Sequence, residues 1–155
     1  MKRILLHNIR SAHNVGSIFR TADGAGVGRI YLSGYTPRPL DRFGRVQPEI
    51  EKTSLGASAI VPWEDLKNDP LPTLQELTRA GVTVVAIEQD PRAVSLYDFT
   101  PPEDVVYVFG NEIEGVSSEL LDVADVVVEI PMHGTKESLN VSVAAGIILF
   151  ARADR

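Results

Sequence analysis

The chain reads IPMHGTKESLNVSVAAG from Ile130 to Gly146. A strand-like apolar run ends at Pro131, a short polar loop follows, and an apolar segment rich in small residues begins after Asn140. Small side chains let a helix pack closely against its neighbours, and Ser138 and Asn140 stand where a helix begins and backbone amides are free. Because packing alone does not require these polar residues, the stretch predicts a strand, a functional loop and a helix in direct succession.

Short β-branched or leucine-rich runs alternate with helical segments along the rest of the 155 residues. The predicted strands are Arg3–His7, Arg29–Ser33, Ala59–Pro62, Thr83–Ile87, Val105–Gly110 and Val126–Ile130. The predicted helices are Asn14–Ala25, Leu74–Arg79, Ser117–Val123 and Asn140–Ala153. Such alternation is typical of parallel strands joined by helical crossovers, so we expect one α/β domain without a linker or repeat.

Composition excludes several classes of protein. The chain has no cysteine, which rules out disulfide bonds and cysteine-ligated zinc and favours a reducing cytoplasm. No apolar run approaches the length that spans a membrane. The three histidines, His7, His13 and His133, share no ligand spacing, so we expect no metal site.

Charge is distributed unevenly. Residues 1–52 hold nine Lys or Arg and four Asp or Glu, a net charge of +5, whereas residues 53–155 carry a net charge of −11. The arginines of the first third either form a local positive surface suited to phosphate groups or are ordinary solvated side chains. Charge alone does not decide between these alternatives.

Two further segments carry polar residues that packing does not explain. In the predicted helix from Asn14, the apolar spacing makes one buried face, and Arg20 lies on another side. This arginine either binds a phosphate or faces solvent. The second segment is Val105–Ser117, in which a buried strand runs into Gly110 and then Glu112 at its carboxyl end, where open α/β sheets place ligands.

Taken in order, these segments resemble the SPOUT superfamily, and within it the TrmH-like (SpoU-type) RNA 2′-O-ribose methyltransferases. The resemblance extends from Asn8 to Arg152. It rests on Asn-x-Gly-x-x-x-Arg at Asn14, Gly16 and Arg20, on Phe-Gly-Asn-Glu-x-x-Gly at Phe109–Gly115, on Ile-Pro-Met at Ile130–Met132 and on Ser-Leu-Asn-Val-Ser at Ser138–Ser142.

The resemblance implies a parallel-sheet α/β fold with a trefoil knot at the carboxyl end, formed by one domain over residues 1–155 without a separate RNA-binding domain. It implies that S-adenosylmethionine binds in the knotted loops 88–90, 109–112 and 130–140. The implied cofactor contacts are Gly110, Ile130, Met132 and Leu139. It also implies a homodimer with the site near the interface.

The implied reaction is methyl transfer to a ribose 2′-hydroxyl. By resemblance Arg20 is the central catalytic residue, acting either as a base or as an electrostatic partner of the phosphate and the forming alkoxide. The positioning residues implied with it are Asn14, Glu112, Ser138 and Asn140.

Substrate identity is less defined. A compact RNA such as a tRNA loop is favoured over ribosomal RNA, with the affinity supplied either by the basic first third of a dimer or by an accessory protein. Two alternatives of other classes are a non-catalytic RNA-binding module with the same fold and a nucleotide-binding enzyme that does not act on RNA. The second would need a phosphate loop after the first strand, and residues 9–14 contain no glycine.

Overall fold

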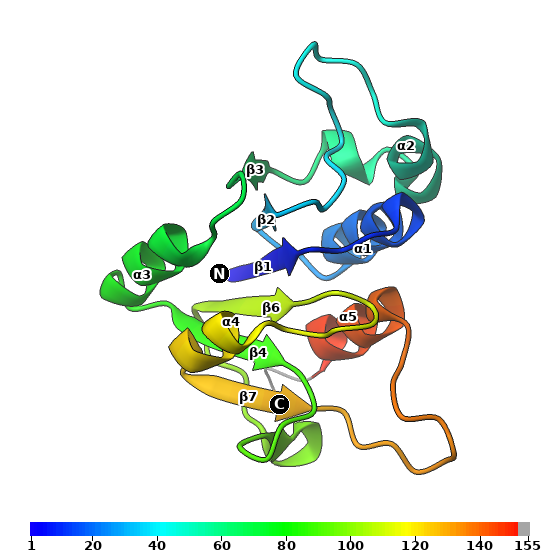
Figure 1. Cartoon of the computed structure of the whole chain (residues 1–155). Coiled ribbons are helices and arrows are strands. Elements are labelled where there is room, and N and C mark those ends of the chain that lie inside the picture. The colour runs from blue at the N-terminus through cyan, green and yellow to red at the C-terminus, as the bar shows by residue number, and fades with distance from the viewer. Residues whose placement is uncertain (152–155) are drawn as a thin grey trace.

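The computed structural model describes residues 1–151, which form a sheet of seven parallel strands (Figure 1). The strand order is β3-β2-β1-β6-β4-β7-β5. The strands are β1 (Lys2–His7), β2 (Arg29–Ser33), β3 (Trp63–Asp65), β4 (Thr83–Ile87), β5 (Val94–Ser95), β6 (Val105–Phe109) and β7 (Val126–Glu129). All of β6 is buried, as expected for a central strand covered on both faces. The predicted parallel α/β fold is therefore confirmed, while the knot stays a prediction.

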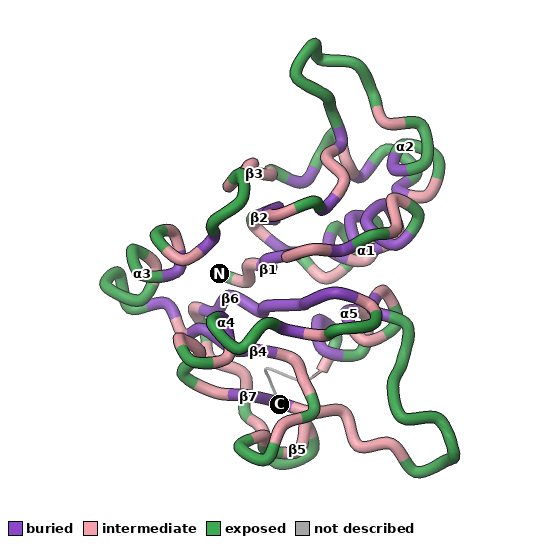
Figure 2. The backbone as a smooth tube through the Cα atoms, viewed as in Figure 1, coloured by how far each residue is buried: buried purple, intermediate pink, exposed green. Residues whose placement is uncertain are grey.

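Five α-helices cover the two faces of the sheet among the described residues. They are α1 (Ala12–Gly24), α2 (Pro48–Ser54), α3 (Leu71–Arg79), α4 (Ser118–Val123) and α5 (Val141–Phe150), with short 3-10 turns at Ala57–Ala59 and Leu96–Asp98. Helices α1, α2 and α5 lie on one side and α3 and α4 on the other (Figure 2). None of these helices is both long and apolar enough to cross a membrane.

Alternation along β1 builds a core on each face. Ile4 and Leu6 pack with the α1 and α5 side, whereas Leu5 packs with the α3 and α4 side, and all three are fully buried. On α1, the predicted apolar face is buried, including Ile18 and Phe19. Burial of several large side chains on both faces supplies the main hydrophobic stabilisation of the fold.

The structure corrects one predicted strand. Residues 59–62 belong to a 3-10 turn and the segment after it, and β3 begins only at Trp63, which pairs with Ile30. Val61 is buried because it packs into the core from an irregular segment, so its apolar character alone did not indicate a strand. Helix α2 was not predicted, although it begins with Pro48 at its first turn and is capped by the Gln47 side chain.

Several boundaries also differ. Helix α1 begins at Ala12, with Ser11 as its N-cap, so Asn14 lies in the first turn rather than at the start. Helix α5 begins at Val141 and ends at Phe150. The predicted end of this helix, Ala153, lies outside the described residues.

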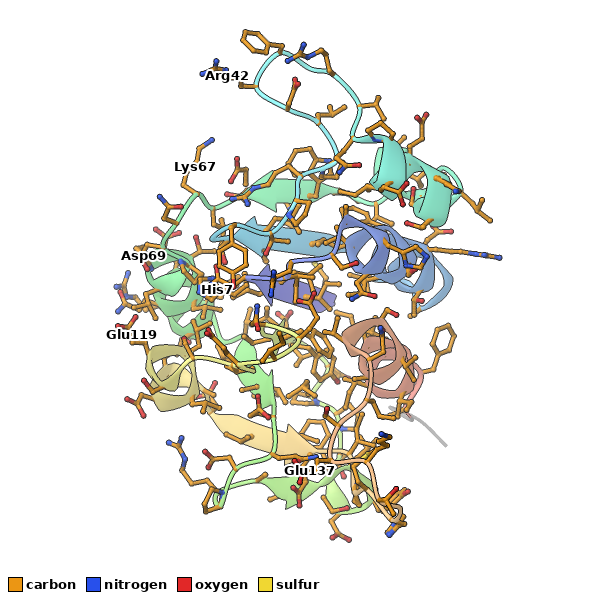
Figure 3. The ribbon with its side chains drawn as sticks, turned by 45° about the vertical axis from the view of Figure 1, so that its right-hand side comes forward. His7, Arg42, Lys67, Asp69, Glu119 and Glu137 are labelled. Atoms are coloured by element: carbon orange, nitrogen blue, oxygen red, sulfur yellow. The ribbon has the colours of Figure 1, made fainter. Side chains whose placement is uncertain are left out.

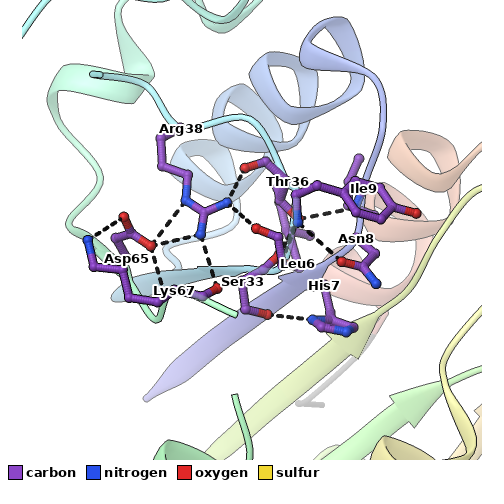
Figure 4. A network of polar contacts seen from close by, with 11 residues as sticks. Leu6, His7, Asn8, Ile9, Ser33, Thr36, Arg38, Asp65 and Lys67 are labelled. Carbon is purple, nitrogen blue, oxygen red and sulfur yellow. Dashed lines mark hydrogen bonds and ion pairs between the residues drawn. The ribbon is translucent and has the colours of Figure 1, made fainter. Parts of the chain in front are cut away.

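A polar network holds the loops at the carboxyl ends of β1 and β2 (Figure 4). The Thr36 hydroxyl accepts a hydrogen bond from the Ile9 amide at 3.1 Å and lies 3.0 Å from the Leu6 carbonyl oxygen. Arg38 donates to the Asp65 carboxylate at 2.8 and 3.1 Å. Partial burial opposes ionisation of Asp65, but the hydrogen bonds from Arg38 and Lys67 outweigh it and lower the pKa of Asp65 to about 2.

Helices α1 and α2 lie in close contact at Gly16, so we expect a larger side chain there to destabilise the fold. A Cβ at Gly16 would lie 1.8 Å from the Thr53 hydroxyl oxygen and 2.8 Å from the Ile50 carbonyl oxygen. We expect Gly16→Ala to push the helices apart and lower the free energy of unfolding by about 1–3 kcal/mol, as overpacking does. Chemical denaturation measures this change. The matched control is Gly24→Ala on the same helix, whose Cβ would lie 3.5 Å from Phe150, and equal losses in both variants would contradict the prediction.

A second prediction concerns His7, at the end of β1. Its ring nitrogen Nδ1 lies 2.8 Å from the Ser33 hydroxyl oxygen, and Figure 3 shows the side chain at the same edge of the molecule as Asp69 and Glu119. Burial lowers the pKa of His7, while the two carboxylates act in the opposite direction. Because the unfolded chain then binds the proton more readily, His7 costs stability as the pH falls below the ordinary histidine pKa, and costs none above it.

Titration of the His7 imidazole by NMR should therefore give a pKa below 6.5. The variant Glu119→Gln removes a charge that raises this pKa, so we expect a further decrease. The variant Glu49→Gln, on the α2 side of the sheet, serves as the control. A His7 pKa at or above the ordinary value would contradict the assignment.

Candidate active site

Three loops meet at the carboxyl edge of the sheet and enclose a cavity of about 510 Å³. They follow β4, β6 and β7 and contribute residues 87–89, 109–116, 129–130, 132 and 137–139 to its wall. Helix α5 closes the cavity with Val141 and Ala144. This is the position at which open α/β sheets bind ligands, and the volume suits a molecule of cofactor size.

Hydrogen bonds to Asn111 hold the turn after β6 in shape. Its side-chain oxygen accepts hydrogen bonds from the amides of Ile113 and Glu114, both at 2.8 Å. Its backbone pairs with Gly115 in both directions. A Cβ at Gly110 would lie 2.3 Å from the Gly115 carbonyl oxygen, so only glycine fits at that position.

The Glu88 side chain joins the loop after β4 to this turn through hydrogen bonds. Its carboxylate accepts hydrogen bonds from the Gln89 amide at 2.8 Å and from the Val116 amide at 2.9 Å. Gly115 has a positive φ of 73°, and a Cβ there would lie 2.0 Å from the Glu88 carboxylate. Two walls of the cavity are thus held together by hydrogen bonds from backbone amides to the half-buried Glu88 carboxylate.

Apolar and acidic side chains share the cavity wall. The apolar part includes Ile87, Phe109, Ile130 and Leu139. Five glutamates also line it, namely Glu88, Glu112, Glu114, Glu129 and Glu137, and no Lys or Arg of residues 1–151 does. The wall therefore favours a ligand with an apolar or aromatic body and positive charge.

Glu112 connects the cavity to helix α1. Its carboxylate oxygens accept hydrogen bonds from the Arg10 amide at 2.9 and 3.1 Å and from the Ser11 amide at 3.1 Å. These amides lie just before α1, where negative charge is favoured by the helix dipole. The carboxylate is thus already engaged by backbone, and its position points to holding α1 against the cavity.

A second contact joins the first and the last motifs, which are 126 residues apart. The Asn140 side-chain amide donates to the Asn14 side-chain oxygen at 3.2 Å. Asn140 also caps α5, because its oxygen accepts a hydrogen bond from the Ser142 amide at 2.8 Å. Asn14 is buried, so the starts of α1 and α5 are held together beside the cavity.

Arg20 lies apart from this cavity. It is exposed on α1 and lines a second, open depression of about 430 Å³ together with Ser17, Thr21, Gly24, Thr53 and Phe150. The cavity and Arg20 are therefore on different surfaces of a single chain. Of the other predicted site residues, those that line the first cavity are Gly110, Glu112, Ile130, Met132, Ser138 and Leu139.

The resemblance implied that loop 88–90 takes part in cofactor binding, but the sequence analysis named neither Glu88 nor Gln89 as a site residue, and it missed a third residue altogether. Glu88 and Gln89 line the cavity, and Gln89 donates to the Glu137 backbone. Both directly follow β4, so the rule that drew attention to Gly110 also applied to them. The third is Tyr35, whose hydroxyl accepts from the Asn111 side chain at 2.9 Å, a contact that no spacing in the sequence indicates.

The geometry agrees with comparisons to known proteins. The sequence model of the SpoU rRNA Methylase family matches residues 1–150. A tRNA (guanosine(18)-2'-O)-methyltransferase of Thermus thermophilus is 39% identical over 153 residues, covering 95% of this chain and 71% of that protein. A 23S rRNA (guanosine-2'-O-)-methyltransferase of Neisseria meningitidis is 33% identical over 146 residues, which are 94% of this chain and 55% of that protein.

Among solved structures, the AdoMet-bound rRNA methyltransferase of Sinorhizobium meliloti has a TM-score of 0.84 at 31% identity. The match covers 97% of this chain and 54% of the Sinorhizobium chain. Our chain therefore spans about half the length of the Sinorhizobium protein and of the Neisseria relative. The family match over residues 1–150 agrees with the geometry, in which two of the motifs meet at one cavity and Asn14 of the third contacts Asn140 beside it: this chain belongs to the SpoU rRNA methylase family.

Proposed function

We propose that this chain methylates a ribose 2′-hydroxyl in RNA with S-adenosylmethionine as the methyl donor. The observation that carries the proposal is the cavity of about 510 Å³ between the loops after β4, β6 and β7, with Asn14 and Asn140 in contact beside it. Membership of the SpoU family and the names of the relatives support it. We place the reaction in the cytoplasm, which suits a chain without cysteine.

The residues of the cavity fit this cofactor. S-adenosylmethionine, when bound, supplies a methyl group on a positively charged sulfur. The apolar side chains of Ile130 and Leu139 suit its adenine ring, and the acidic wall suits its positive charges. Gly110 allows the backbone of the turn to approach a ligand closely. We therefore assign Gly110, Ile130, Met132 and Leu139 as cofactor contacts.

The polar residues around the cavity have separate tasks. The ribose oxygen must pass its proton to solvent water as it gains the methyl group, and negative charge develops on it while the proton leaves. An arginine stays protonated in proteins, so we assign Arg20 to holding the adjacent phosphate and stabilising this charge. Glu112, Asn14 and Asn140 position helix α1, and Ser138 lies in the cavity wall, where we assign it to positioning the ribose.

We further propose that two copies of the chain form the working enzyme. Helix α5 leaves three large apolar side chains exposed, Val143, Ile147 and Phe150, with exposed fractions of 49%, 38% and 62%. Phe150 lies beside Arg20 in the open depression. Pairing through this helix would bury the apolar side chains and give Arg20 a route to the cavity of the other copy, which it lacks in one chain.

We take tRNA as the first substrate to test and ribosomal RNA as the second. The relative named for tRNA has the higher identity of the two relatives described, at 39% against 33%. Residues 1–155 would act as one methyltransferase domain, with no part set aside as a separate RNA-binding domain. The basic first third, with its net charge of +5, would supply the RNA contacts in place of an accessory protein.

Arg20→Ala tests the catalytic assignment. We expect the rate at which methylated RNA forms to fall by about 10²–10³-fold, the loss seen when one group stabilising a developing oxyanion is removed. Calorimetry should show an unchanged affinity for S-adenosylmethionine, because Arg20 does not line the cavity. Arg79→Ala, at the exposed end of α3, is the control. Normal turnover by the Arg20 variant would refute the assignment.

Ile147→Asp tests the dimer. A charge in the exposed apolar strip of α5 should convert dimers into monomers, as measured by light scattering, and should reduce turnover with it. The circular dichroism of the monomer should stay native, because Ile147 is 38% exposed in the single chain. Ile60→Asp, at an exposed position away from α5, should remain dimeric. If the Ile147 variant stays a dimer, α5 is not the interface.

A further inference from the structure

Residues 39–47 form a hairpin that projects from the body of the molecule beyond α2 (Figure 1). The Asp41 amide donates to the Arg45 carbonyl oxygen and the Gln47 amide to the Pro39 carbonyl oxygen, both at 2.9 Å. Leu40 and Val46 pair across it in an antiparallel bridge. The hairpin is therefore an ordered element in spite of its position outside the core.

Asp41 fixes the tip of this hairpin. Its carboxylate accepts hydrogen bonds from the Phe43 amide at 2.8 Å, the Arg45 amide at 2.9 Å and the Arg45 guanidinium at 2.8 Å. The hydrogen bond from the Arg45 amide is the main cause that lowers the pKa of Asp41. Gly44 completes the turn with a positive φ of 75°. The geometry of the tip is thus set before any partner arrives.

The tip presents an exposed aromatic ring with two guanidinium groups close to it. The Phe43 side chain is 66% exposed, although phenylalanine is usually buried. The Arg42 and Arg45 guanidinium carbons lie 4.7 and 5.0 Å from its ring centroid. Arg42 forms no ion pair within residues 1–151, and Figure 3 shows it at the outer end of the hairpin.

This combination matches an unpaired nucleotide. An exposed aromatic ring stacks on a base that has left its helix, and guanidinium groups bind the phosphates on either side of it. In a closed duplex, stacked bases offer no free face to such a ring. The chemistry therefore favours single-stranded RNA over both a duplex and a neutral protein surface.

The hairpin is also connected to the helix that carries Arg20. It runs directly into α2, and the Thr53 hydroxyl of that helix donates to the His13 carbonyl oxygen of α1 at 3.2 Å. The same hydroxyl occupies the space that a Cβ at Gly16 would need. An RNA bound at the hairpin would therefore be held at a set position relative to α1.

We propose that Phe43, flanked by Arg42 and Arg45, is a docking point for an unpaired nucleotide of the RNA substrate, away from the methylated ribose. This inference rests on the proposed RNA methyltransferase function and adds a substrate contact to it. Phe43 stacks on the base, Arg42 binds phosphate, and Arg45 both binds phosphate and keeps the tip in shape through Asp41.

Direct binding tests the stacking role without any need for turnover. In Phe43→Trp, the new indole should be quenched when a short RNA stem-loop with unpaired loop nucleotides is added. A closed RNA duplex should quench it little. Tyr97→Trp, at a 74% exposed position beyond β5, is the matched control and should not respond above the signal of native Trp63.

Affinity and kinetics give the second measurement. Phe43→Ala should weaken stem-loop binding by about tenfold, since loss of one stacked base costs roughly 1–3 kcal/mol. It should raise KM for RNA with little change in kcat or in the affinity for S-adenosylmethionine. Tyr97→Ala should change none of these, and Phe43→Trp should restore the affinity.

The outcomes separate this inference from the proposed function. If the protein binds the stem-loop and Phe43→Trp is quenched but no methyl group is transferred, the docking point stands and the methyltransferase proposal fails. If Phe43→Ala binds the stem-loop as tightly as the unaltered protein, or if duplex and stem-loop quench the indole equally, the docking point is wrong. Failure of the unaltered protein to bind the stem-loop would also overturn it, whatever the result with S-adenosylmethionine alone.

Discussion

A single carboxylate connects the cavity to the helix that carries Arg20. Glu112 belongs to the turn after β6 that lines the cavity, and its oxygens accept hydrogen bonds from the Arg10 and Ser11 amides ahead of α1. Charge-assisted hydrogen bonds of this kind are about twice as strong as neutral ones. Because α1 also carries Arg20, these hydrogen bonds fix the turn against the helix that holds it. The Asn14–Asn140 contact makes the same link from the other side, through α5.

Close backbone contact is the second requirement of this arrangement. Gly16 lets α1 lie against α2, and Gly110 and Gly115 let the turn after β6 fold on itself and on Glu88. A side chain at any of these positions would have to displace backbone atoms or polar side-chain atoms. The glycines of the motifs are thus explained by packing around the cavity, independently of any contact that they make with a ligand.

The sequence predicted the sheet and the site to different degrees. Buried parallel strands are continuous apolar runs, so β1, β4 and β6 were predicted within a residue or so of their observed ends. The predicted strand at 59–62 was wrong, because an irregular segment that packs apolar side chains into the core has the same sequence pattern as a buried strand. The three loops around the cavity were expected from the family resemblance, and the turn at Gly110 was also expected from its place after a buried strand. The hydrogen bonds of Glu112 were not predicted, because Arg10 and Ser11, whose amides donate them, lie about a hundred residues away in sequence. The separation of Arg20 from the cavity was also not predictable, since no local pattern encodes which surface of the folded chain a helix face shares.

The distribution of charge gives a physical reason why an acidic chain can act on RNA. The net charge of −6 would repel a polyanion if it were spread evenly, but residues 1–52 carry +5 and the remainder −11. Acidic side chains line the cavity that suits a cationic cofactor, whereas the exposed arginines of the hairpin lie outside it. At physiological salt, charges separated by more than about 8 Å are largely screened from one another, so the two regions can attract opposite ligands. On this argument the acidic body disfavours non-specific contact with RNA, and only an RNA that meets the arginine-rich surface in the right position gains the attraction.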